Sequence, residues 1–293
     1  MSLKEIQARD AQAQAEIDAI LSRKPLTYSF FSERIHAFVM RKFLLNRADL
    51  NSSDDLTELA TISLSKTMKL SPELIAEYQA GENCEGATST DVKRTLLIVK
   101  IQKSLGVKLT LEELMRVKTV EDLTRELWPH LDVEREPTET DEAAAGSSGD
   151  NSSGESSIDK QQDDIVRRFQ SIGDPLSQYE YLIEFASKLE PMDENSKTDE
   201  NLVKGCQSKA WLSLENRDGF LRMQAASDTL IIRGVLYLLR EVLDGKPLQD
   251  VAAATIYFPE KADIVATFSS SRRSGVKSLI ATIQDFARKQ VES

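Results

Sequence analysis

Hydrophobic residues in the first part of the chain recur every three or four positions, which is the period of an α-helix. The spacing predicts a helix that Ser32 caps, a second that opens at Ser71 and Pro72, and a strongly apolar third over 91–105. Two capping boxes predict short helices after these: Thr110 with Glu113, and Thr119 with Asp122. The pattern indicates an all-helical domain at residues 1–135.

The pattern changes in the last part of the chain, where a stretch of alternating apolar and polar residues joins the helical periods. The alternation predicts a β-hairpin with its turn at 216–219 and with these inward residues: Leu212 and Leu214 on one strand, and Leu221, Met223 and Ala225 on the other. Ser227 or Asp228 is expected to cap a long helix that ends at Gly245. Further helices are predicted at 165–169, 179–189 and 276–286. The fold class expected for residues 158–293 is α+β, with helices packed on a small antiparallel sheet.

Between the two domains, residues 136–157 are rich in Ser, Gly, Glu and Asp and contain no aromatic or large aliphatic side chain. Such a segment cannot bury enough apolar surface to offset the entropy of ordering it, so we expect a disordered linker. Eleven acidic and only two basic side chains lie within 132–164, so most of the net charge of −11 is local. This acidity argues against a nucleic-acid partner.

The length of 293 residues and the 40% hydrophobic content are enough for two cores. No run of 18 apolar residues occurs and the first residues are charged, so we expect a cytoplasmic protein with no membrane partner. The two cysteines, Cys84 and Cys206, are far apart, and His36 and His130 lie near neither. This spacing argues against a zinc site and a disulfide framework, and no metal is expected.

Cys206 lies in the stretch VKGCQSKAW, directly after a glycine and just before a predicted strand. Lys204, Lys209, Arg272 and Arg273 are cations that would lower the pKa of its thiol if they lay nearby. A lowered pKa would make Cys206 a nucleophile. The alternative is an inert buried thiol, because free cysteines are among the most buried residue types.

Three segments of the last domain carry a resemblance to a known family: NLVKGCQSKAWLSLE, SDTLIIRGVLYLLREVLDGK and FSSSRRSGVKSLIATI. In this order and spacing they resemble the SufE family of sulfur acceptors, over about residues 160–290. The resemblance implies a SufE/IscU-like α+β fold. It also implies that Cys206 is the residue that accepts sulfur.

The other residues that the resemblance implies for the site are these: Gly205, Gln207, Ser208 and Trp211 of the cysteine signature, Asp228 and Arg233 of the helix motif, and Arg272 of the Ser-Arg motif. Gly205 would allow a sharp loop, and Arg272 would contribute charge near the thiolate. From the residues alone, Asp228 is also interpretable as a helix cap and Trp211 as a core residue. Arg233 and Arg240 would then be a solvated or ion-paired stripe of one helix.

The resemblance implies that a cysteine desulfurase of the SufS kind, which holds pyridoxal phosphate, hands sulfur to Cys206 for iron–sulfur cluster assembly. A SufBCD-like scaffold complex would be the downstream partner, and this chain would bind no cofactor itself. A cluster scaffold would need several thiolates, whereas residues 158–293 contain only Cys206. The alternative is an adaptor that binds and regulates a desulfurase while no sulfur passes through it.

Residues 88–127 resemble the second half of an acyl carrier protein, with a long helix, a loop and Thr-Val before the last helix. The expectation is an acyl-carrier-like fold without bound phosphopantetheine, because Ser89 needs a two-residue shift to match the modified serine. A plain helical bundle is the alternative. Cys84 lies between Glu82 and Glu85, which would raise its pKa, so a relay from Cys206 to Cys84 is a secondary hypothesis.

Overall fold

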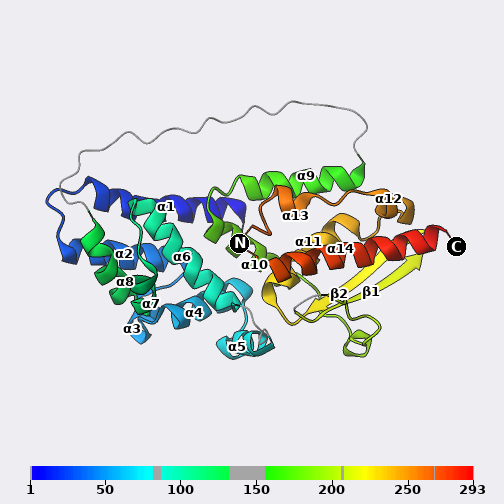
Figure 1. Ribbon diagram of the computed structural model, residues 1–293, viewed down its shortest axis with the longest axis horizontal. Coiled ribbons are helices and arrows are strands. Elements are labelled where there is room, and N and C mark those ends of the chain that lie inside the picture. Colours follow the sequence, from blue (N-terminus) through cyan, green and yellow to red (C-terminus); the bar gives the residue numbers. More distant parts are fainter. Residues whose placement is uncertain (1, 82–86, 132–155, 206–207, 267, 293) are drawn as a thin grey trace.

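A computed structural model describes residues 2–81, 87–131, 156–205, 208–266 and 268–292. Cys84, Cys206, Gln207 and nearly all of the predicted linker therefore lie outside the described residues. The described chain forms two parts, which we call the helical half (2–131) and the mixed half (156–292). Figure 1 shows them side by side along the longest axis of the molecule.

The helical half contains only helices among its described residues, as the hydrophobic period predicts. Its elements are α1 (Leu3–Ser22), α2 (Tyr28–Lys42), α3 (Arg47–Ser52), α4 (Leu56–Met68), α5 (Pro72–Gly81), α6 (Ser89–Leu105), α7 (Leu111–Arg116), α8 (Val120–Leu127) and a 3-10 turn, Trp128–His130. Both predicted capping boxes are present, at the starts of α7 and α8. The predicted cap at Ser32 is wrong, because Thr27 caps α2 and Ser32 lies inside that helix. The similarity to acyl carrier proteins stays a prediction.

The mixed half packs helices on a two-stranded antiparallel sheet, which confirms its α+β class. Its elements are α9 (Ser157–Gln170), α10 (Pro175–Ala186), a 3-10 turn (Glu194–Ser196), β1 (Ala210–Arg217), β2 (Phe220–Ser227), α11 (Leu230–Leu243), α12 (Leu248–Ala253), α13 (Phe258–Lys261) and α14 (Ser270–Val291). The hairpin is confirmed, with Leu212 opposite Ala225 and Leu214 opposite Met223. Its turn uses Asp218 at φ 53° and Gly219 at φ 84°, the left-handed region that tight hairpins need.

Several expected boundaries differ in the mixed half, among them those of the helices predicted at 165–169 and 179–189, which are observed as α9 and α10. Ser156 and Ser157, which we assigned to the linker, cap and open α9. The last helix begins at Ser270 because the Ser269 hydroxyl accepts a hydrogen bond from the Arg272 amide. The expected caps of α11 are wrong: Thr229 occupies the cap position, and the Asp228 carboxylate accepts a hydrogen bond from the Thr229 hydroxyl rather than from helix amides.

The two halves share their hydrophobic cores. Leu176 of α10 lies in the core of the helical half. Residues of the helical half lie in turn in the core of the mixed half, and they are Ile6, Leu64, Met68 and Ile75. Helix α10 contacts α1, α4 and α6 as well as α11, so it lies at the boundary. In Figure 1 the beginning of α1 lies in the middle of the molecule, between the halves.

Charged side chains are also buried at this boundary, in a group that we call the ionic cluster: Arg9, Lys42, Lys93, Asp174 and Glu180. Arg9 pairs with Glu180, and the Lys93 ammonium lies 2.8 Å from the same carboxylate, with both Lys93 and Glu180 fully buried. The Lys42 ammonium lies 2.5 Å from Asp174, which caps α10. All three cations of the ionic cluster come from the helical half and both of its carboxylates from the mixed half.

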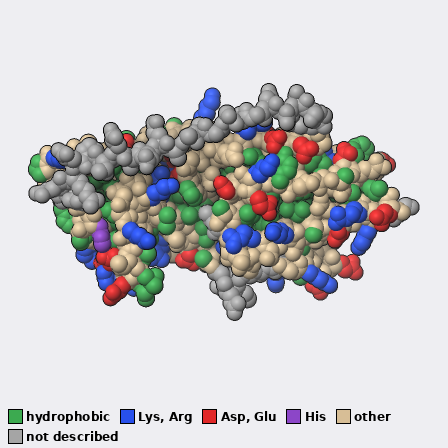
Figure 2. Space-filling view, turned by 45° about the horizontal axis from the view of Figure 1, so that its top comes forward, with side chains coloured by type: hydrophobic (Ala, Val, Ile, Leu, Met, Phe, Trp, Pro, Cys, Tyr) green, Lys and Arg blue, Asp and Glu red, His purple; other side chains and the backbone are tan. Residues whose placement is uncertain are grey.

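The outer surface carries charges of both signs. On the face drawn in Figure 2, Lys and Arg side chains are interspersed with Asp and Glu side chains among the described residues. No helix within the described part of the chain is both long and apolar enough to cross a membrane.

Candidate functional site

The loop of residues 204–209 leaves and rejoins the fold at two paired backbone segments. The Val203 amide donates to the Ala210 carbonyl at 2.8 Å, and the Leu212 amide donates to the Asn201 carbonyl at 2.8 Å. Val203 and Ala210 are buried, whereas Lys204, Gly205 and Lys209 are exposed. The fold therefore fixes both ends of the loop that contains Cys206. Cys206 and Gln207 themselves are not among the described residues.

Gly205 occupies a position that other residues would fill with difficulty. Its φ is +84°, in the left-handed region that favours glycine. A Cβ atom at this position would lie 3.1 Å from the Ser278 hydroxyl oxygen of α14, tighter than ordinary van der Waals contact. The backbone before Cys206 thus passes close to α14, and glycine permits both the turn and the approach.

The other end of the loop is bonded to the corner between β2 and α11. The Lys209 carbonyl accepts hydrogen bonds from the Ser227 hydroxyl at 2.9 Å and from the Asp228 amide at 3.2 Å. Asp228 immediately precedes α11, and Arg233 lies within its first turns. The loop and the helix motif therefore form one connected unit, although about twenty residues of hairpin separate them in the sequence.

A cavity of about 470 Å³ lies beside this unit. The mixed half contributes Trp211, Asp228 and Arg233 to its lining, together with residues of the turn after α10. Trp211 and Asp228 are both half-buried. Burial raises the pKa of the Asp228 carboxyl above its ordinary value, although its hydrogen bond from Thr229 opposes the shift. Three of the predicted site residues thus line one cavity.

Arg233 and Arg240 differ in their environments. Arg240 pairs with Glu190 at 2.8 Å, as the ion-paired interpretation of this helix face predicts. Within the described residues no carboxylate lies at ion-pair distance from Arg233, and its Nε atom is buried without a hydrogen-bond partner. The Arg233 guanidinium lies instead over the ring of Tyr78, 5.2 Å from its centre.

Gly234, next to Arg233, lets two helices approach closely. A Cβ atom at this position would lie 2.4 Å from the Leu182 carbonyl oxygen of α10, closer than any real contact of this kind. Only glycine therefore fits at this point of α11, and this accounts for the glycine inside the helix motif.

Arg272, at the start of α14, is buried and reaches the helical half. Its Nη2 atom donates to the Ala87 carbonyl at 2.7 Å. We predicted that Arg272 contributes charge near the thiolate, and the partner found for it is the backbone just before α6. Ser208 is half-buried at the end of the loop.

Sequence reasoning missed the contribution of the helical half to this region. The cavity is lined by Tyr78, Leu74 and Glu77 of α5. In the sequence these residues have the pattern of an ordinary amphipathic helix. We call the contacts of Tyr78 with Arg233 and of Ala87 with Arg272 the site edge. No pattern in the sequence signals them, because the partners are more than 150 residues apart.

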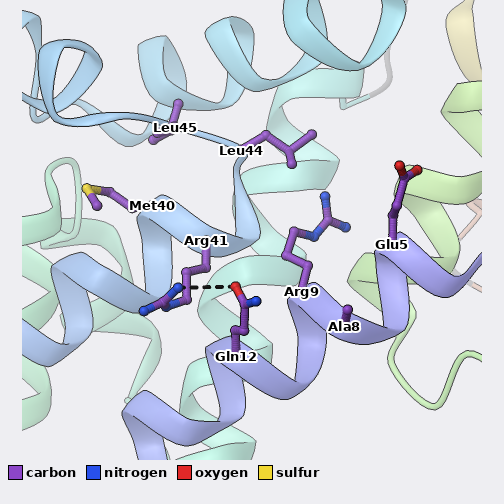
Figure 3. Close-up of a pocket in the computed structure, with 8 residues that line it drawn as sticks. All are labelled: Glu5, Ala8, Arg9, Gln12, Met40, Arg41, Leu44 and Leu45. Carbon is purple, nitrogen blue, oxygen red and sulfur yellow. Dashed lines mark hydrogen bonds between the residues drawn. The ribbon is translucent and has the colours of Figure 1, made fainter. Parts of the chain in front are cut away.

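Two other places carry none of the predicted signature residues. A cavity of about 610 Å³ lies between α1 and the end of α2, where Arg41 donates to Gln12 (Figure 3).

Ser89 is the first residue of α6 and only 2% exposed, and its carbonyl accepts a hydrogen bond from the Tyr179 hydroxyl. A serine buried at the boundary between the halves is poorly placed for a modifying enzyme.

The mixed half is thus defined as a small α+β domain in which the loop that contains Cys206 is bonded to a corner of the fold whose residues line a cavity. Residues 163–287 match the sequence model of the SufE family, described as an Fe-S metabolism associated domain. The chain belongs to the SufE family.

Relatives support this assignment over the mixed half. An uncharacterised SufE-like protein of Synechocystis is 32% identical over 120 residues, which cover 41% of this chain and 76% of that protein. An uncharacterised SufE-like protein of Rhizobium etli is 30% identical over 43% of this chain and 88% of its own length. SufE-like protein 1 of Arabidopsis thaliana, described as chloroplastic/mitochondrial, is 30% identical over 41% of this chain and 33% of its own length. These relatives support a role in iron–sulfur metabolism.

Proposed function

We propose that Cys206 accepts persulfide sulfur from a pyridoxal-phosphate-dependent cysteine desulfurase and passes it on for iron–sulfur cluster assembly. The observation that carries the proposal is that Lys209, at the end of the Cys206 loop, is hydrogen-bonded to Ser227 and Asp228, beside a cavity that the signature residues Trp211, Asp228 and Arg233 line. Family membership supports it independently.

The chemistry needs one thiol from this chain. The Cys206 thiolate attacks the outer sulfur of a cysteine persulfide on the desulfurase, and a new S–S bond forms on Cys206. The bond between the two sulfurs on the desulfurase breaks, and its cysteine leaves as a thiolate. The exchange is redox-neutral, and its rate depends on the thiolate fraction and on access. The exposed Lys204 and Lys209 favour the thiolate through their positive charge.

The proposal assigns supporting roles to the other signature residues. Gly205 allows the turn of the loop, Ser208 precedes β1, and Trp211 lies within β1. Gln207 belongs to the same signature. In this proposal a SufS-like desulfurase holds the pyridoxal phosphate, this chain binds no cofactor, and a SufBCD-like scaffold complex receives the sulfur. Action in the cytoplasm stays a prediction.

Replacing the thiol tests the proposal directly. Cys206→Ser should abolish sulfur loading by a cysteine desulfurase, measured by intact mass as the gain of one sulfur atom, and should abolish stimulation of the desulfurase. Cys84→Ser is the matched control and should load normally.

A different result would identify an adaptor. If Cys206→Ser still stimulated the desulfurase as well as the unsubstituted protein, no sulfur relay would be needed to explain the stimulation. Loss of loading in Cys84→Ser would instead point to the secondary thiol.

A further inference from the structure

Helix α5 lies outside the part of the chain that matches the SufE family, yet it forms a wall of the cavity beside the Cys206 loop. The alignment with the SufE-like protein of Rhizobium etli covers 88% of that relative and 43% of this chain. The wall contributed by α5 therefore comes from outside the part of the chain that matches the SufE family.

The contact between Tyr78 of α5 and Arg233 is the most specific one in this wall. Among the described residues Arg233 has neither a carboxylate partner nor a hydrogen bond at its buried Nε atom. The ring of Tyr78, 5.2 Å from the guanidinium, is the contact that orients it. An arginine over an aromatic ring is attracted to the ring face, and stacking limits its rotamers.

The position of Tyr78 is itself fixed by the fold. Ile75, one turn earlier in α5, is fully buried in the core that the halves share. The Ser71 hydroxyl accepts a hydrogen bond from the Leu74 amide at the start of α5. The ring is thus held by a helix anchored in the core, so its position does not depend on surface contacts alone.

We propose that Tyr78 is a positioning residue for sulfur transfer. Its ring holds Arg233 in the cavity wall, next to Trp211 and Asp228, in the orientation that a docking desulfurase meets. This inference rests on the proposed function, because the partner it concerns is the desulfurase. The helical half thereby contributes to partner recognition.

The test measures how the desulfurase responds to increasing concentrations of the full chain. Tyr78→Ala should raise the concentration for half-maximal stimulation by roughly three- to tenfold, the range expected for a partly desolvated cation–ring contact. The maximal rate should stay within about twofold, because Tyr78 does not touch the reacting sulfur. Tyr78→Phe, which keeps the ring, should behave like the unsubstituted protein.

A double-substitution cycle separates positioning from a general structural effect. In an Arg233→Ala background, Tyr78→Ala should add no further change, because the residue it acts through is gone. Urea unfolding checks that the variants are folded. If Tyr78→Ala is not folded, Tyr78→Leu keeps apolar bulk without a ring and should show the same rise in half-maximal concentration.

Two results would overturn the inference. One is an unchanged half-maximal concentration in a folded Tyr78→Ala or Tyr78→Leu variant. The other is a lowered concentration, which would mean that α5 obstructs docking. Failure of the proposed function looks different, because then the unsubstituted protein would take up no sulfur at all.

Discussion

The boundary between the halves contains two regions that differ in how they use charge. The ionic cluster buries its cations against carboxylates of α10, away from solvent. At the site edge, Arg233 and Arg272 contact an aromatic ring and a backbone carbonyl instead. Removing one partner from a buried ion pair costs far more than losing a contact between an arginine and a neutral ring or carbonyl. The ionic cluster therefore makes the association of the halves specific, and the site edge connects the helical half to the site at little energetic cost.

The largest expected effect tests the ionic cluster at its centre. Glu180→Gln removes the carboxylate that pairs with both Arg9 and Lys93 in the buried boundary, so it should lower the free energy of unfolding by about 3–5 kcal/mol. Urea denaturation measures the loss. Glu190→Gln, which removes the exposed partner of Arg240, is the control and should cost no more than about 1 kcal/mol. Equal losses in the two variants would abolish the distinction between the two regions.

A smaller effect, which depends on pH, is expected at Asp174. Burial alone would raise the pKa of this carboxyl, but the charge and hydrogen bond of Lys42, together with smaller contributions from Lys100 and Ser177, outweigh burial and lower the pKa below its ordinary value of 3.8. The stabilisation is therefore complete above the ordinary pKa and is lost as pH falls through the lowered one. Asp174→Asn should cost about 1–3 kcal/mol near pH 7, with the difference from the unsubstituted protein shrinking below about pH 4.

Urea unfolding of Asp174→Asn and of the unsubstituted protein, repeated from pH 7 to below pH 4, measures the difference in their free energies of unfolding. Asp285→Asn, which removes an exposed partner of Arg288, provides the comparison and should show almost no difference at any pH. A stability difference for Asp174→Asn that did not depend on pH would contradict the assigned role of Lys42.

The smallest effect is expected at the site edge. Arg272→Lys keeps the charge but loses the hydrogen bond to the Ala87 carbonyl, so unfolding should become easier by about 1 kcal/mol. Thermal or urea unfolding detects a change of this size. Arg273→Lys, at the exposed neighbouring position, should have no measurable effect. A loss as large as that of Glu180→Gln would mean that the site edge, too, holds the halves together.

Local features of the fold were predictable from the sequence. The hairpin and the capping boxes depend on residues within a few positions of one another, such as Thr110 with Glu113. Asp228 was assigned wrongly as a cap because several polar residues precede α11 and the sequence does not say which one takes the cap position. The family motifs identified Trp211, Asp228 and Arg233, and the structure brings all three to one cavity.

The packing of the halves was not predictable. Lys42, Lys93 and Glu180 are charged residues on amphipathic helices, and such residues normally face water. Their burial depends on partners about 90 to 130 residues away. The acidic segment led us to divide the chain into two domains there, and nothing in its sequence indicates that the cores share residues such as Leu176 and Ile75.

The separation of charges in the ionic cluster has a consequence for synthesis on the ribosome. Arg9, Lys42 and Lys93 are made first, and the carboxylates of Asp174 and Glu180 follow only after the acidic segment has been translated. Lys42 also pairs with Asp10 of the helical half, but the carboxylate found for Lys93 among the described residues is Glu180, so until then Lys93 must stay hydrated, because a buried charge without a countercharge is strongly unfavourable. The nascent helical half therefore cannot bury Lys93 as in the final structure before α10 leaves the exit tunnel.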